Sequence, residues 1–246
     1  MFGSIALMLF ATWLLRKRVS EDVHNANNQF AGTMFAALAT LYGVLLAFIV
    51  VAEWQEYQDT RGIVQMEANA VMNLYRFSWE MPAPYDYEIR SLVKTYIKNV
   101  IHDEWVMMQH GASSPSVEAQ IESLWTIHRS IHTNKIEMPS DTGSMYDAIT
   151  ELTDARRMRL EESRAELPRL IWILLWGGGI IVLGYALFLR SPNERAHYLM
   201  IALATALIAF VLFLIVELDE PFLGEISVSP RPFERILVTI EQIEGK

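Results

Sequence analysis

The chain has 246 residues, no cysteine and a formal net charge of −9 at pH 7. Without cysteine it has no disulfide, no thiolate metal site and no cysteine nucleophile. Its acidic balance argues against a nucleic-acid partner, because an acidic surface repels phosphate. Hydrophobic residues make up 52% of the sequence, and four apolar runs account for this high share.

The first apolar run occupies residues 1–15 and is followed at once by Arg16, Lys17 and Arg18. It has no positive charge before the apolar stretch, and no small-residue cleavage site ends it. We therefore interpret it as a retained membrane anchor and not as a cleaved signal peptide. The basic triplet favours the cytoplasmic side for the end of this span.

The second run, residues 30–52, contains 23 residues without a charge. A helix of this length, at ~1.5 Å per residue, extends about 35 Å and crosses a hydrocarbon core of about 30 Å. Ala39, Gly43 and Ala47 recur at every fourth position, so one face can approach another helix closely. After Glu53 the pattern becomes amphipathic, with no Pro or Gly before Gly62. This predicts one helix that leaves the membrane and continues into water.

A hydrophilic insert follows, with 19 acidic and 12 basic residues between positions 53 and 169. Its apolar residues keep helical spacing throughout. They predict a helix up to the break at Pro82 and Pro84, a second from residue 86 to about Gly111, a third from Pro115 and a fourth from about residue 144.

Two further apolar runs, residues 170–189 and 196–216, predict spans three and four. Span three contains Gly177, Gly178 and Gly179, which indicate close helix packing or, as the less favoured alternative, a hinge. The predicted fold is an all-α membrane protein with four transmembrane helices. Residues 1–52 hold spans one and two, 53–169 the helical insert, 170–217 spans three and four, and 218–246 a tail with a short helix near 233–243.

No pattern predicts a catalytic, metal or cofactor site. His128 and His132 have a spacing that can share a metal ion, but no carboxylate follows at a useful distance, so a packed or solvated pair is favoured. His102, Asp103 and Glu104 point in different directions on a helix, which favours a solvated face over acid–base work. We therefore expect a protein that is not an enzyme.

Apart from His197 at the start of the fourth run, none of the four runs contains Asp, Glu, Lys, Arg or His. This disfavours proton-coupled transport, which places such groups at membrane depth, and leaves open a channel whose apolar constriction gates by dewetting. Acidic residues do lie where spans two and four leave the membrane. In an oligomer they would form charged rings, and the alternative is ordinary interface charge. These residues are Glu53, Glu56, Glu217, Asp219 and Glu220.

Nearly the whole chain after residue 25 resembles the bacterial bestrophin-like family, and more distantly the bestrophin channels. The stretches that carry the likeness are GVLLAFIVVAEWQEYQDTRG, IRSLVKTYIKNVIHDEW, DARRMRL and ELDEPFLGEISVSPRPFE. The resemblance implies a pentamer in which the second membrane helix lines a pore neck. Carried over, the neck residues are Thr40, Val44 and Phe48, which share one helical face. The alternative is that Val44 and Phe48 pack against a neighbouring span.

A second match is Pro221, Phe222 and Gly224, which resembles the Pro-Phe-Gly segment after the fourth bestrophin span. Leu223 interrupts it, and the acidic run that clasps calcium in animal bestrophins is missing. The resemblance therefore implies no calcium gating. Ile49, Val50 and Val51 stand where bacterial bestrophins have polar residues after the neck.

We expect a multi-pass protein of the bacterial inner membrane whose partners are the lipid bilayer, other copies of the chain and monovalent ions. The resemblance implies a cytoplasmic insert. The arginines of the short connections suggest the opposite, but four arginines before span three balance them. They are Arg156, Arg157, Arg159 and Arg164. The second hypothesis is a non-conducting scaffold or accessory subunit that binds a partner through Trp105 and Trp125.

Overall fold

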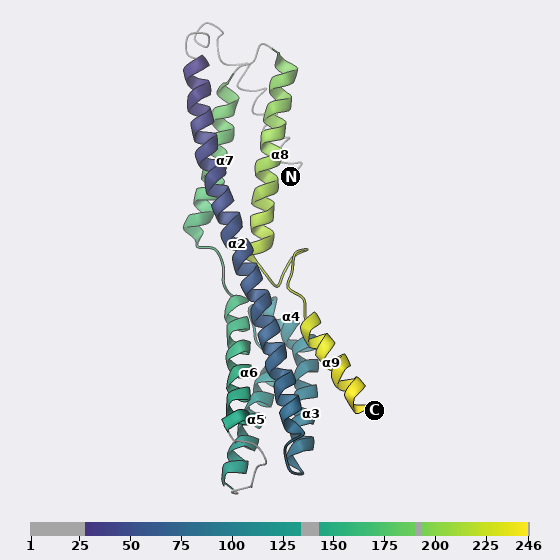
Figure 1. Cartoon of the computed structure of the whole chain (residues 1–246). Coiled ribbons are helices and arrows are strands. Elements are labelled where there is room, and N and C mark those ends of the chain that lie inside the picture. The colour runs from purple at the N-terminus through teal and green to yellow at the C-terminus, as the bar shows by residue number, and fades with distance from the viewer. Residues whose placement is uncertain (1–27, 134–142, 190–192, 246) are drawn as a thin grey trace. The chain divides into compact units, whose positions relative to one another are not determined.

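The computed structural model describes residues 28–133, 143–189 and 193–245, and every regular element in these ranges is a helix (Figure 1). The chain divides into two compact units. The membrane unit comprises Met1–Gln55 and Glu166–Asp219, and the insert unit comprises Glu56–Ala165 and Glu220–Lys246. The predicted first span, residues 1–15, lies outside the described residues.

Helix α2 runs without a break from Asn28 to Ser78 and contributes to both units. This confirms the prediction that the second span continues beyond the apolar run as one helix. The helix ends shortly before Pro82 and Pro84, because proline lacks the N–H group that a continuing helix needs.

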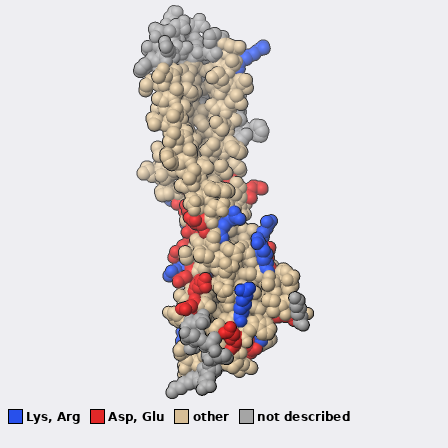
Figure 2. Space-filling view, in the orientation of Figure 1, with Lys and Arg blue, Asp and Glu red and all other residues tan. Residues whose placement is uncertain are grey.

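The membrane unit contains the first part of α2 together with α7 (Arg169–Phe188) and α8 (Glu194–Asp219). All three helices are long and apolar enough to cross a membrane. In Figure 2 the visible surface of this unit carries few charged side chains, whereas the charged groups gather on the insert unit. Its interior is small, because most apolar side chains face outward. The buried residues of its hydrophobic cluster are Tyr42, Leu46, Leu175, Val182, Leu212 and Ile215.

The glycines of α7 make room for Tyr42 of α2. A Cβ atom added at Gly178 would lie 2.6 Å from Tyr42 Cε2, and one at Gly179 would lie 3.0 Å from Tyr42 Oη. The hydroxyl of Tyr42 donates a hydrogen bond of 2.8 Å to the carbonyl oxygen of Leu175. At Gly177 a Cβ would meet nothing within 4 Å. Close packing, and not a hinge, therefore explains two of the three glycines.

The insert unit packs the second part of α2 against the insert helices and the C-terminal helix. These are α3 (Tyr85–Asn99), η2 (Val100–Glu104), α4 (Trp105–Met108), α5 (Pro115–Thr133), α6 (Gly143–Glu162) and α9 (Arg231–Glu244). Leu74, Ile97, Leu124 and Ile149 lie at the centre of its core. The helix predicted from residue 86 to about Gly111 is interrupted by one turn of π-helix at η2.

The Pro221–Phe222–Gly224 segment returns the chain from α8 into the core of the insert unit. Gly224 adopts a φ of 76°, which favours glycine, and the Val228 N–H donates a 2.7 Å hydrogen bond to the Pro221 carbonyl. The Phe222 ring lies edge-on to Trp105 with centroids 5.5 Å apart. The segment thus anchors a tail whose own pattern is irregular.

Candidate functional site

The three predicted neck residues lie on one exposed face of α2. Thr40 is exposed, and Val44 and Phe48 keep 49% and 71% of their surface accessible. The opposite face of α2 is buried in the protein, because Tyr42 and Leu46 on that face are each only 6% exposed. We call Thr40, Val44 and Phe48 the neck face. Within the described chain it is an apolar surface with a single hydroxyl.

Small residues border the neck face. Gly43 and Ala47 are exposed, and a Cβ atom at Gly43 would meet nothing within 4 Å. In the part of the chain that the structure describes, no helix therefore occupies this position. Small residues allow the backbone of a neighbouring helix to come close.

The five acidic residues expected at the membrane boundary do not behave alike. Glu56 and Glu220 are exposed, and Glu217 and Asp219 are partly buried. Asp219 accepts a hydrogen bond of 2.6 Å from the Leu167 N–H group. Glu53 differs from the other four, because only 3% of its surface is exposed.

Sequence reasoning missed a further acid, Glu162, at the end of α6. The Thr60 hydroxyl donates a hydrogen bond of 3.5 Å to its carboxylate. Burial raises the pKa of Glu162, and the negative charges of Glu56 and Asp59 raise it further. The three acids Glu56, Asp59 and Glu162 thus form a cluster, and their negative charges repel one another.

A buried ion network lies at the centre of the insert unit. We use this name for Glu67, Glu104, Arg156, Arg159 and Tyr96. Arg159 is fully buried and donates to Glu67 from Nε at 2.6 Å and to Glu104 from Nη2 at 2.7 Å. Arg156 donates to Glu104 from Nη2 at 2.7 Å, and the Tyr96 hydroxyl donates to Glu67 at 2.6 Å. Two carboxylates and two guanidinium groups leave the network neutral, as burial requires.

The network shifts the pKa values of its members. Burial alone would raise the pKa of Glu104, but the hydrogen bonds and charges of Arg156 and Arg159 outweigh it and lower this pKa. The pKa of Tyr96 is raised well above its usual value by burial and by the charge of Glu67. Because folding lowers the pKa of Glu104, its contribution to stability is present above the pKa of the unfolded chain. The contribution is lost as the pH falls through the lower pKa of the folded protein.

The prediction that Glu104 lies on a solvated face is wrong. Glu104 and Trp105 are buried, while His102 and Asp103 remain exposed. Glu104 lies seven positions after the buried Ile97, so it falls on the face of the helix that packs into the core. A sequence signal existed for the arginines. Met145, Ile149, Leu152, Arg156 and Arg159 follow one another at helical spacing, and a charged residue on an apolar stripe indicates a buried partner.

The two tryptophans predicted to contact a partner pack against residues of the chain itself. Trp105 is only 6% exposed and packs edge-on against Phe222 and Phe233, so the prediction that it binds a partner is wrong. Trp125 is partly buried and contacts His128 and Tyr146. His128 also packs against His132, with ring centroids 5.0 Å apart.

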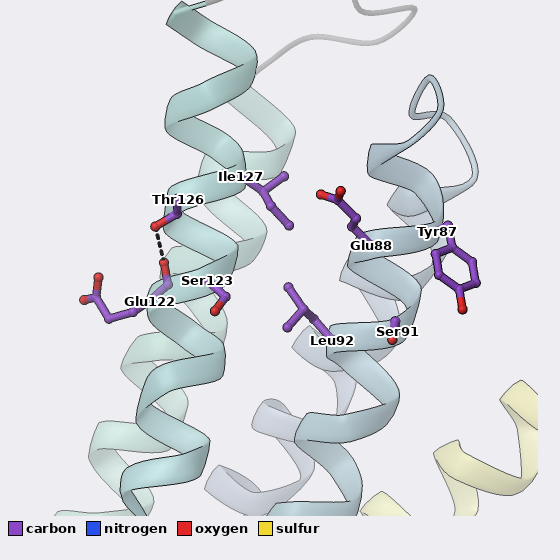
Figure 3. Close-up of a pocket in the computed structure, with 8 residues that line it drawn as sticks. All are labelled: Tyr87, Glu88, Ser91, Leu92, Glu122, Ser123, Thr126 and Ile127. Atoms are coloured by element: carbon purple, nitrogen blue, oxygen red, sulfur yellow. Dashed lines mark hydrogen bonds between the residues drawn. The ribbon is translucent and has the colours of Figure 1, made fainter.

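A groove of about 540 Å³ lies between α3 and α5 (Figure 3). Leu92 and Ile127 face the gap, and Glu122 points away from it. The carboxylate of Glu122 pairs loosely with Arg129 at 3.9 Å, and the Thr126 hydroxyl bonds to the Glu122 backbone at 2.8 Å. The residues that line this groove do not bring a nucleophile and a base together, so its shape carries no catalytic argument.

The comparisons agree with this architecture. The family model for the bestrophin-like domain matches residues 2–233 of the sequence. A crystal structure of a bacterial bestrophin homologue from Klebsiella pneumoniae has a TM-score of 0.74 at 13% identity, and the alignment covers 100% of this chain and 98% of that one. A substituted form of the same homologue has a TM-score of 0.75 at 13% identity, with 100% and 99% covered. No sequence match to a curated protein was found.

Fold and apolar helices together define an all-α membrane protein. The family match covers most of the chain, and the solved structures have the same fold at low sequence identity. The chain belongs to the bestrophin-like family.

Proposed function

We propose that this chain forms a homo-oligomeric ion channel of the bacterial inner membrane, with five subunits as the favoured number. Copies of α2 surround a shared axis, and the neck face of Thr40, Val44 and Phe48 lines the narrowest part of the path. Monovalent ions pass this apolar constriction when it is hydrated, and the insert unit forms a vestibule. The insert lies in the cytoplasm.

The observation that carries the proposal is the sidedness of α2. Its inner face packs Tyr42 and Leu46 into the membrane unit, whereas Phe48 on the other face is 71% exposed. Gly43 and Ala47 beside it leave space for a neighbouring helix. A helix with one face packed, one face lined by small residues and one apolar face is suited to line an oligomer axis.

The acidic residues support cations as the conducted ions. Glu56, Asp59 and Glu162 gather in the insert unit, and repetition around an axis multiplies their field. A negative potential raises the local concentration of cations. A carboxylate cluster at the mouth therefore favours cations over anions.

The test compares two phenylalanines that are exposed in the membrane unit. Phe48→Ala removes the bulkiest side chain of the neck face, so ion flux into liposomes should rise about tenfold or more because a wider apolar constriction hydrates more easily. Phe213→Ala on α8, where the side chain is 54% exposed, should leave flux unchanged. Native mass measurement of the same samples should count five subunits.

Two results would contradict the proposal. One is a monomeric protein, since the neck face then has no axis to surround. The other is no flux from well-folded oligomers of Phe48→Ala under varied salts and pH, which would favour a non-conducting membrane scaffold instead.

A further inference from the structure

A second groove, of about 810 Å³, lies in the insert unit between α2 and the segment that leads into α9. Three arginines line it, Arg61 from α2 and Arg231 and Arg235 from α9. Among the described residues that line it, none is Asp or Glu. We call this groove the arginine groove. Its lining is positively charged, whereas the whole chain carries a net charge of −9.

The arginines of α9 have no carboxylate partner in the part of the chain that the structure describes. All three guanidinium groups belong to exposed residues. Arg61 donates a hydrogen bond of 3.4 Å to the side chain of Gln58 and lies 5.9 Å from the centre of the Tyr57 ring. Arg231 and Arg235 are four residues apart on one helix, a spacing at which like charges repel each other. A bound anion would relieve this repulsion.

Neutral donors complete the walls of the groove. Gln58 contributes from α2, and Ser227 and Ser229 contribute from the segment before α9. Guanidinium groups bind phosphate through paired N–H donors, and hydroxyl and amide groups supply further hydrogen bonds to its oxygens. The volume suits an organic ligand and exceeds what a single small ion needs.

We propose that the arginine groove binds a phosphate-bearing anion through Arg61, Arg231 and Arg235. Two sources have this chemistry, an anionic lipid headgroup and a soluble polyphosphate. Arg61 follows Ala52, the last residue of the predicted second span, by only nine residues in sequence. This short separation places Arg61 within a few helical turns of the lipid headgroups at the end of the span. This inference goes beyond conduction and does not depend on it.

The experiment uses the full chain in an uncharged detergent and has two arms. Calorimetry measures binding of tripolyphosphate, and native mass spectrometry measures binding of phosphatidic acid against phosphatidylcholine with the same acyl chains. At least one anionic probe should bind, and added salt should weaken it because the contacts are solvent-exposed. Binding confined to phosphatidic acid assigns the groove to a lipid headgroup, and binding confined to tripolyphosphate assigns it to a soluble ligand.

Variants connect the binding to the groove. The double variant Arg231→Gln/Arg235→Gln should weaken binding about tenfold or more, because it removes two charged hydrogen-bond donors. Arg61→Gln, on the opposite wall, should weaken it in the same direction. Arg76→Gln is the matched control, since Arg76 is also an exposed arginine of α2 but does not line the groove. Thermal unfolding checks that each variant is folded.

Two results would overturn the proposal. In the first, neither anionic probe binds the unsubstituted protein. In the second, the groove variants bind as tightly as Arg76→Gln.

Discussion

At the scale of single residues, the contact between Tyr42 and the α7 glycines shows how the lack of a side chain lets two helices pack together. The Tyr42 ring occupies the volume in which a side chain at Gly178 would lie. Its hydroxyl then reaches a backbone carbonyl at Leu175. A polar group inside an apolar helix pair is stable there because its hydrogen bond is made within the membrane unit.

Gly178→Ala should therefore destabilise the membrane unit, whereas Gly177→Ala should not. The added methyl group at Gly178 must displace the Tyr42 ring, and such overpacking costs ~1–3 kcal/mol. The same methyl group at Gly177 meets open space. Thermal unfolding of the detergent-solubilised protein should show a lower midpoint for Gly178→Ala alone. Equal midpoints for the two variants would contradict this packing.

At the scale of elements, the buried ion network joins helices that are far apart in sequence. Glu67 on α2 and Arg159 on α6 are separated by 92 positions, and Glu104 lies on the π-helical turn between α3 and α4. The network also continues to the surface, because Arg156 pairs with the exposed Glu118 of α5. Hydrogen bonds and ion pairs of the network thus connect α2, α3, η2, α5 and α6.

Arg159→Met should strongly destabilise the insert unit. Removing one partner of a buried ion pair leaves the carboxylates uncompensated, and this typically costs ~3–5 kcal/mol. Arg157→Met is the control on the same helix, because the Arg157 side chain is 67% exposed and its ion pair with Asp154 is worth at most ~1 kcal/mol. Chemical unfolding followed by tryptophan fluorescence measures both.

A double variant separates charge from packing. Glu67→Gln/Arg159→Met removes one charge of each sign, so it should regain part of the stability that Arg159→Met loses. If Arg159→Met and Arg157→Met unfold alike, the network contributes nothing to stability.

At the scale of the whole molecule, the positive-inside rule depends on which arginines carry a charge that no buried carboxylate neutralises. Two of the four arginines before span three, Arg156 and Arg159, are buried in ion pairs with Glu104 and Glu67. Their charges are neutralised inside the insert unit. The exposed arginines close to the start of span three are Arg157, Arg164 and Arg169. Fewer free positive charges therefore oppose the arginines of the short connections under the positive-inside rule.

Because the chain has no cysteine, single introduced cysteines report the topology directly. With a cytoplasmic insert, Pro192→Cys between spans three and four should react with a membrane-impermeant maleimide in intact cells. Ser113→Cys in the insert should react only after permeabilisation. The reverse pattern would place the insert outside the cytoplasm.

Much of the fold was predictable because its causes are local. The run from Phe30 to Ala52 has the length and hydrophobicity of a span, and the prolines at 82 and 84 cannot continue the helix that precedes them. The neck face was predictable as a face, since Thr40, Val44 and Phe48 follow one another at the helical repeat. Whether they line a path remains a prediction that the flux experiment tests.

The sequence by itself determined the membrane helices, the helical insert and the family, because apolar length, helical period and motif spacing belong to single segments. Only the tertiary structure decided that Glu53, Glu104 and Trp105 are buried, that Tyr42 explains two glycines, and that three arginines from both ends of the insert unit line one groove. The physical reason is that burial and ion pairing depend on partners that are distant in sequence.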